Sequence, residues 1–243
     1  MDAPNEFGKI LKRLRIEAGL SQESLAERAR IASESFRRTG ADWAEMRALD
    51  LPAHAVEAAL LALMPEGGAG RLLDIGTGTG RVLELLAPLV RQALGVDASK
   101  AMLALARARL ARTELAHCSV RLADMYRLAL SDASFDTVVL QMVLHYAEDP
   151  AGVVTEAARV LRPGGRLIVI DLAAHERADL TAKLAHRWPG FSDAAMHELL
   201  ANAGLDGGEA VTIPGPLDVR IWPATRVADA AAERSRVLAT HDE

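Results

Sequence analysis

The sequence of 243 residues holds a single cysteine, Cys118, and few aromatic side chains, which make up 4% of the residues. One cysteine excludes an intramolecular disulfide, so we expect a reducing, cytoplasmic compartment. No apolar run reaches the roughly 18–20 residues that span a bilayer. The start, MDAPNEFGKI, also lacks the basic-then-apolar profile of a signal peptide. The net charge of −5 argues against a chain-wide nucleic-acid surface.

Two common phosphate-binding motifs are absent from the glycine-rich stretch at 71–86, RLLDIGTGTGRVLELL. The dinucleotide fingerprint needs a glycine three residues after Gly78, and that position is Arg81. A P-loop needs Gly-Lys-Ser/Thr after the strand, and the stretch has none. The glycines therefore either pack a helix against a strand or receive a ligand other than a phosphorylated nucleotide.

Acidic residues stand where that ligand would bind. Asp74 precedes Gly76 by two residues, Asp97 ends the apolar run at 92–97, and Asp124 ends the run at 118–124. A carboxylate beside the glycine turn repels a pyrophosphate but attracts an ammonium group. A second carboxylate can accept hydrogen bonds from the two hydroxyls of a ribose, and a third carboxylate can accept one from the exocyclic amine of an adenine. S-adenosylmethionine has all three groups, so it fits this pattern.

The order of apolar segments predicts an α/β fold. Strands are expected at 71–75, 92–97, 118–124, 135–141 and 166–171, and helices at 79–90, 99–112, 151–161 and 192–205. Strands that alternate with helices form a parallel sheet covered on both faces. Arg162–Gly165 predicts a turn between a helix and the last of these strands. The runs at 209–213 and 217–222 are parted by three residues, which predicts an antiparallel pair at the sheet edge.

The motifs DIGTGTG, GVDAS, LADMY, FDTVVLQMVLHY and VLRPGGRLIVID occur in the order and spacing of one family. Through them, residues 70–225 resemble the class I S-adenosylmethionine-dependent methyltransferases, in particular the domain attached to some bacterial metalloregulator-type repressors. The resemblance implies a Rossmann-like, doubly wound sheet of seven strands with the last strand antiparallel. We divide the chain into a helical extension at 1–40, a helical lid or linker at 41–68, the methyltransferase domain at 69–225 and a tail at 226–243.

The resemblance also implies the cofactor site. Its residues would be Asp74, Gly76, Thr77, Gly78, Gly80, Asp97, Ala98, Asp124, Met125 and Gln141. Asp74 and the glycines would contact the methionine moiety, Asp97 the ribose, and Asp124 with Met125 the adenine. Gln141 would face the methyl donor.

Three histidines follow the fourth and fifth strands, where a methyl acceptor would lie. His145, His175 and His186 are candidates for a general base, because imidazole titrates near neutral pH. They are equally compatible with polar residues satisfied at helix ends, and two of them could hold a metal ion, although we expect none. Arsenite as acceptor is rejected, because a soft metalloid needs several thiolates and the chain has only Cys118.

The N-terminal stretch FGKILKRLRIEAGLSQESLAERAR resembles the first two helices of a Cro-type helix-turn-helix. A third helix would fall on residues 31–40, and the last two helices of that domain have no room. Half a domain cannot bury its own apolar faces, so we expect it to pack on the main domain or to form a homodimer. The sequence thus predicts a methyltransferase with a small-molecule acceptor and no membrane partner. The alternative is a DNA-binding regulator that senses S-adenosylmethionine or S-adenosylhomocysteine, which the acidic balance of the chain disfavours.

Overall fold

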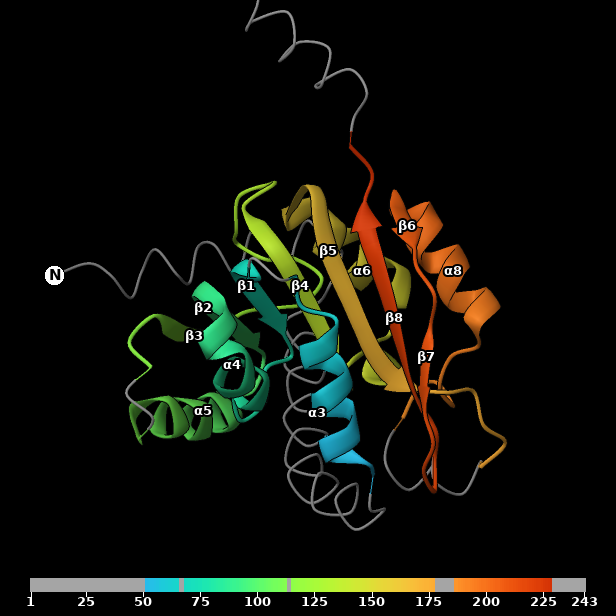
Figure 1. The fold of residues 1–243 in the computed structure, drawn as a ribbon, viewed down its shortest axis with the longest axis horizontal. Helices are drawn as coiled ribbons and strands as arrows, with labels where there is room; N and C mark the ends of the chain where they lie inside the picture. The colour runs from blue at the N-terminus through green and yellow to red at the C-terminus, as the bar shows by residue number, and fades with distance from the viewer. Residues whose placement is uncertain (1–50, 66–67, 113–114, 178–185, 229–243) are drawn as a thin grey trace, which may run out of the picture. The chain divides into compact units, whose positions relative to one another are not determined.

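The computed structural model describes residues 51–65, 68–112, 115–177 and 186–228, and these contain one mixed sheet (Figure 1). Its strands are β1 (Gly70–Ile75), β2 (Val90–Asp97), β3 (Cys118–Leu122), β4 (Phe135–Gln141), β5 (Leu161–Leu172), β6 (Leu205–Gly207), β7 (Val211–Ile213) and β8 (Val219–Arg226). They lie in the order β3-β2-β1-β4-β5-β8-β6, and β7 also pairs with β8. The first five strands are parallel, and β8 is antiparallel to β5. The predicted α/β sheet with an antiparallel last strand is confirmed.

The expected strand at 209–213 and the pair it forms are present, but this edge of the sheet is interrupted. β6 pairs with residues 224–226 of β8, and β7 pairs with residues 219–221. The two short strands thus share β8 between them, which gives eight strands in the described residues where seven were expected.

Helices cover both faces of the sheet. They are α3 (Ala53–Ala62), α4 (Arg81–Leu86), α5 (Lys100–Arg112), α6 (Pro150–Val160) and α8 (Asp193–Asn202), with short 3-10 turns η1 (Ala87–Leu89) and η2 (Leu144–Tyr146). α3, α4 and the end of α5 bury apolar side chains in a core on one face, and α6 with α8 does so on the other. α5 begins after Ser99, as predicted, and the Ser99 hydroxyl accepts the Met102 N–H at 3.3 Å. Each helix therefore contributes one apolar face to a two-sided core.

Several element boundaries differ from the prediction, and two of them are explained by strand pairing. Residues 162–165, expected as a turn, belong to β5: Leu161 pairs with Phe135 and Arg166 with Thr137, so the register shifts around the inserted residues. Because β5 pairs with β4 on both sides of residues 162–165, these residues stay within the strand. The helix expected to close at Gly204 ends at Asn202, and β6 begins at Leu205, where it pairs with β8.

Among the described residues, no helix is both long and apolar enough to cross a membrane. The partial helix-turn-helix at 1–40 lies outside the described residues. So do most of the tail at 226–243 and residues 41–50 of the predicted lid, while α3 lies within the remaining part of that segment and packs Val56 and Leu60 into the core.

Candidate functional site

The parallel strands end at one edge of the sheet, where the order reverses between β1 and β4. From β1 the chain moves outward to β2 and β3, then returns to β4 on the other side of β1. Ligands of open α/β sheets bind at such a reversal, beyond the carboxyl ends of the strands. The glycine turn follows β1 directly and therefore lies at this point.

The glycine turn is fixed to the neighbouring strand β2. The N–H groups of Gly76 and Thr77 both donate to the Val96 carbonyl, at 2.8 and 2.9 Å. Gly76 has a φ of 75°, and a Cβ there would stand 2.3 Å from the Val143 side chain. Gly76 is thus required by packing and by a left-handed backbone, which L side chains rarely adopt.

Gly78, two residues on, has different surroundings. Its φ is 51°, and the nearest atom to a Cβ at that position would be the Gly76 carbonyl oxygen at 4.0 Å. A Cβ at Gly80 would lie 3.2 Å from that of Ala106, so Gly80 allows helix α5 to approach. Of the three glycines, only Gly78 has no other protein atom closer than 4.0 Å to a Cβ at its position, which leaves room for a ligand to approach its backbone.

Asp97, the last residue of β2, is held beside this space. Its Oδ2 accepts the Gly78 N–H at 2.8 Å, and its Oδ1 accepts the Ser99 N–H at 2.7 Å. Burial raises the pKa of Asp97, and these backbone hydrogen bonds oppose the rise. Ala98 is exposed between Asp97 and Ser99. The carboxylate is therefore oriented before any ligand arrives, with lone pairs left to accept further hydrogen bonds.

Asp74 lies inside the sheet, two residues before the turn. Its side chain is buried, and Oδ2 has no hydrogen-bond partner among the described residues. Burial raises the pKa of Asp74 to about 7; the Thr77 hydroxyl opposes the rise and the charge of Asp97 adds to it. An orphaned buried carboxyl oxygen costs free energy, which a cationic ligand group would recover.

The predicted adenine contacts, Asp124 and Met125, follow β3. Asp124 is exposed and accepts the Tyr126 N–H at 3.0 Å, while Met125 is half-buried. The Tyr126 hydroxyl accepts the N–H groups of Glu148, at 2.7 Å, and Asp149, at 3.3 Å. Tyr126 thereby ties the loop after β3 to the loop before α6, along the same edge of the sheet. Sequence reasoning missed Tyr126, because no spacing signal links it to residues 148 and 149.

Gln141 ends β4 and is half-buried. Met142 follows it with a φ of 55°, which is uncommon for a non-glycine residue, and its N–H donates to the Ile170 carbonyl at 2.7 Å. This bend ends the strand and starts η2, which carries His145.

His145 and Asp171 form a fully buried pair after β4 and in β5. His145 Nδ1 lies 2.6 Å from Asp171 Oδ1, and the exposed fractions of the two side chains are 0% and 1%. Asp171 Oδ2 also accepts the N–H of Leu144, at 3.0 Å, and that of His145, at 3.3 Å. His145 Nε2 has no partner among the described residues. Asp171 thus fixes both the ring of His145 and the backbone of η2.

His186 packs against His145. Their ring centroids are 4.3 Å apart, and the His186 ring meets that of Tyr146 edge-on at 5.2 Å. Burial, with a smaller contribution from the neighbouring His145, lowers the pKa of His186 to about 4. Both ring nitrogens of His186 are buried without a partner in the described residues. At neutral pH this imidazole is uncharged and can accept a hydrogen bond.

The segment from His186 to Phe191 is attached to the ends of β4 and β5. The His145 carbonyl accepts the N–H groups of Arg187, at 2.9 Å, and Trp188, at 3.2 Å. The Trp188 indole N–H donates to the Ala147 carbonyl at 2.8 Å, and the Phe191 N–H donates to the Leu172 carbonyl at 2.9 Å. This segment therefore forms a wall next to the histidines.

His175 completes the set of predicted histidines. It is half-buried after β5, its N–H donates to the Pro189 carbonyl at 2.9 Å, and its charge acts on the pKa of His186. No group of three His, Cys, Asp or Glu side chains in the described part of the chain has the geometry to hold a metal ion. The fold thus brings together three histidines from separate segments, His145, His175 and His186. They lie at the edge of the sheet where the parallel strands end, as the glycine turn does.

Comparison with known proteins assigns the family. Residues 73–169 match the model of a methyltransferase domain. Phosphatidylethanolamine N-methyltransferase of Cereibacter sphaeroides is 36% identical over 156 residues, which are 61% of this chain and 76% of that protein. Arsenite methyltransferase of Aquipseudomonas alcaligenes is 38% identical over 117 residues, which are 44% of this chain but only 34% of that protein. Several curated relatives thus extend well beyond the stretch they share with this chain.

Solved structures show the same fold at low identity. The YcgJ protein of Bacillus subtilis superposes with a TM-score of 0.62 at 17% identity, covering 73% of this chain and all of that one. Geranyl diphosphate C-methyltransferase of Streptomyces coelicolor gives a TM-score of 0.63 at 16% identity, covering 72% of this chain and 77% of that one. The sheet order, the glycine turn with its acids and these sequence matches agree. The chain belongs to the S-adenosylmethionine-dependent methyltransferase family, with S-adenosylmethionine as its cofactor.

Proposed function

We propose that the protein transfers a methyl group from S-adenosylmethionine to a small-molecule acceptor at the carboxyl ends of β4 and β5. The observation that carries this proposal is the pair of acids at the glycine turn. Asp97 is oriented by Gly78 and Ser99, and the unpartnered oxygen of Asp74 lies buried beside the same turn. An acid-rich turn that faces open space at Gly78 suits a ligand with an ammonium group and a ribose, and repels a pyrophosphate.

Each residue of the cofactor site has a proposed task. Asp74 holds the ammonium group of the methionine moiety, and Gly76, Thr77, Gly78 and Gly80 shape the turn around it. Asp97 accepts the ribose hydroxyls, and exposed Ala98 leaves room beside them. Asp124 and Met125 flank the adenine, and Gln141 faces the methyl donor. When bound, the cofactor supplies an electrophilic methyl group on a sulfonium, and the protein must align the acceptor and exclude water.

The histidines belong to the acceptor side in this proposal. His186 offers a neutral imidazole, whose low pKa makes it a hydrogen-bond acceptor and a weak base at neutral pH. His145 is fully buried and acts as a positioning residue, since Asp171 fixes its ring against that of His186. His175, in the segment after β5, is the second candidate proton acceptor in this proposal. Trp188 and Phe191, stacked at 6.1 Å, close the wall.

The chemical class of the methyl acceptor is to be found by testing candidate compounds. The relatives' names suggest two probes, phosphatidylethanolamine and a malonyl thioester. Arsenite stays disfavoured, because Cys118 is buried at the start of β3, which is the opposite end of the strands from the glycine turn. The regulator alternative rests on residues 1–40, which lie outside the described residues, and no observation favours it.

Calorimetric titration tests the cofactor site directly. S-adenosylmethionine and S-adenosylhomocysteine should bind, and NAD and ATP should not. Tight NAD binding with no heat from S-adenosylmethionine would overturn the proposal. Transfer is tested by incubating the protein with S-adenosylmethionine and dioleoylphosphatidylethanolamine or a malonyl thioester. Mass spectrometry should find S-adenosylhomocysteine and an acceptor heavier by one CH₂.

The same assay separates the histidines. His186→Asn should raise the KM for the acceptor and leave the affinity for S-adenosylhomocysteine unchanged. His145→Asn should lower stability as well, because it weakens the pair with Asp171. Equal kinetic constants in His186→Asn and the unmodified protein would remove His186 from the acceptor site.

A further inference from the structure

The connection between β3 and β4 differs from the other connections of the parallel strands. Helices α4, α5 and α6 join β1 to β2, β2 to β3 and β4 to β5, but residues 123–134 contain no helix. Parallel sheets are normally covered by helices on both faces. Within the described residues, the face that packs α6 and α8 therefore has no helix from this connection to cover β1, β2 and β3.

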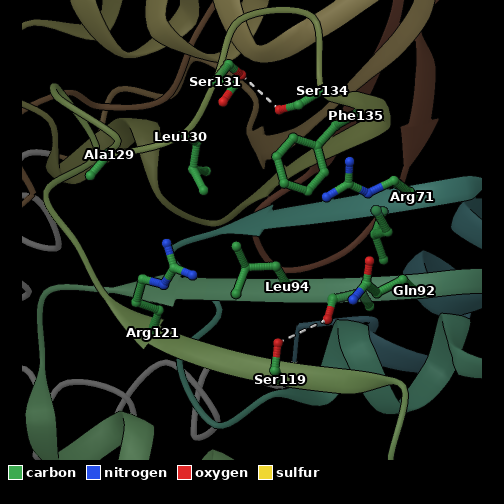
Figure 2. Close-up of a pocket in the computed structure, with 12 residues that line it drawn as sticks. Arg71, Gln92, Leu94, Ser119, Arg121, Ala129, Leu130, Ser131, Ser134 and Phe135 are labelled. Carbon is green, nitrogen blue, oxygen red and sulfur yellow. Dashed lines mark hydrogen bonds between the residues drawn. The ribbon is translucent and has the colours of Figure 1, made fainter.

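A hollow of about 370 Å³ lies on this part of the sheet (Figure 2). Leu94, Leu130 and Phe135 give it an apolar floor, and all three belong to the core on the α6 and α8 face. Its volume lies in the range of small-molecule sites. The hollow extends from Arg71, near the start of β1, to Arg121, near the carboxyl end of β3. None of its lining residues belongs to the proposed cofactor site.

Two arginines stand on either side of the apolar floor. Arg71 comes from β1 and Arg121 from β3, with Leu94 on β2 between them (Figure 2). The Arg71 guanidinium carbon lies 5.2 Å above the centre of the Phe135 ring, which orients the group and leaves its N–H edge available. Ser131 and Gln92 also line the hollow and add polar groups to it.

These two guanidinium groups have no carboxylate partner among the described residues, although acids are close. Asp136 Oδ1 pairs with Arg162 at 2.5 Å, and its Oδ2 accepts the backbone N–H of Arg71. Asp132 pairs with Arg159. The nearby acids are thus engaged by other cations, and the hollow keeps two unneutralised positive charges next to an apolar surface.

We propose that this hollow binds a small amphipathic anion, a phosphate or carboxylate carried on a short apolar chain. The anionic group lies between the guanidinium groups of Arg71 and Arg121, which recognise both anions through paired N–H donors. The apolar chain covers Leu94 and Leu130. The site is separate from the cofactor site and does not depend on the proposed methyl transfer.

Isothermal titration with octyl phosphate, octanoate, inorganic phosphate and 1-octanol tests the site. Octyl phosphate or octanoate should bind at least tenfold more tightly than either inorganic phosphate or 1-octanol, because only the amphiphiles use both the charge and the floor. The stronger of the two amphiphiles identifies the preferred anion. Equal binding of 1-octanol, or absence of binding by both amphiphiles, would overturn the proposal.

Variants locate the binding. Arg121→Gln should weaken amphiphile binding about tenfold, and Arg121→Lys should restore part of it, because a charge remains without the planar fork. Arg91→Gln is the matched control: Arg91 is exposed on β2, next to Gln92, and does not line the hollow. S-adenosylhomocysteine affinity should stay constant in all three. The same loss in Arg91→Gln as in Arg121→Gln would show nonspecific attraction and refute the site.

Discussion

The glycine turn lies at the same edge of the sheet as a second region, here called the histidine wall, which consists of η2, the end of β5 and the segment from His186 to Phe191. The two regions are built in different ways. The turn and its acids come from β1, β2 and the residues just after them, and Asp97 is fixed by backbone groups of Gly78 and Ser99. The wall joins η2, β5 and the segment from His186, and a buried side chain, Asp171, fixes it. Backbone holds the first region and buried side-chain pairing holds the second, so substitutions should separate them.

The two regions share one electrostatic feature. Burial raises the pKa of Asp74 to about 7 and lowers that of His186 to about 4. Both shifts favour the neutral form, because a buried charge loses its hydration. The difference is that a cationic ligand can restore the charge of Asp74, whereas His186 is held uncharged at neutral pH.

The largest effect is expected where a side chain holds a region together. Asp171→Ala leaves the buried His145 ring and the Leu144 N–H without their acceptor, so the free energy of unfolding should fall by about 3–5 kcal/mol. Urea unfolding followed by circular dichroism measures this loss. Asp206→Ala, at an exposed position on β6, is the control and should change little. A loss below about 1 kcal/mol would show that Asp171 does not organise the wall.

A substitution at Gly78 should lower the affinity for S-adenosylhomocysteine more than it lowers the stability of the fold. Gly78→Val places a branched side chain in the open space at the turn, so S-adenosylhomocysteine affinity should fall by about 3 kcal/mol or more, roughly a hundredfold. The left-handed φ adds strain of about 1–2 kcal/mol, which the fold should survive.

Gly76→Ala is the contrasting variant, because its Cβ would stand 2.3 Å from Val143 and should destabilise the fold itself. Calorimetry and thermal unfolding on both variants separate the two outcomes. Unchanged affinity in Gly78→Val would mean that the ligand does not approach this backbone.

Asp97→Ala should weaken S-adenosylhomocysteine binding by about 1.5–3 kcal/mol, the range for hydrogen bonds to a charged group. Asp97→Asn keeps one acceptor oxygen and should lose less. Calorimetry gives both affinities, and the thermal midpoint checks that the contacts to Gly78 and Ser99 are not needed for folding. A folded Asp97→Ala variant with full affinity would remove Asp97 from the ribose role.

The last prediction is a pH dependence set by the raised pKa of Asp74. Because the pKa of Asp74 is about 7 in the folded protein and near 4 in an unfolded chain, the folded state binds the extra proton between these values. The contribution of Asp74 to stability is therefore full below pH 4 and declines as pH rises to about 7. Ligand affinity should move the other way, rising towards pH 8 as the carboxylate forms and attracts the ammonium group.

Asp74→Asn should remove both the pH dependence of stability and that of ligand affinity. The difference between the unmodified protein and the variant therefore gives the contribution of Asp74, separate from that of other titrating groups. The measurements are S-adenosylhomocysteine titration and urea unfolding from pH 5 to pH 8. Parallel curves for the two proteins would show that Asp74 does not titrate in this range.

Much of the fold could be predicted because its signals are local. Apolar runs predicted β1 to β4 with small errors at their ends, and Ser99 marked the start of α5. The start of β5 and the division into β6 and β7 could not be predicted, because both depend on pairing with a distant strand. The hollow was equally hidden, since the absence of a helix between β3 and β4 exposes Arg71 and Arg121 only once the strands lie side by side.

By itself, the sequence determined the alternation of strands and helices and the acid-rich glycine turn, because these depend on residues close along the chain. The sequence also indicated the three histidines as candidate residues, but it did not predict their contacts with one another or with Asp171. Only the tertiary structure decided that Asp171 lies under His145 and that His186 packs on the same ring. The physical reason is burial: the hydrogen bonds and pKa shifts of these side chains arise from neighbours that the fold supplies, and no spacing in the sequence records them.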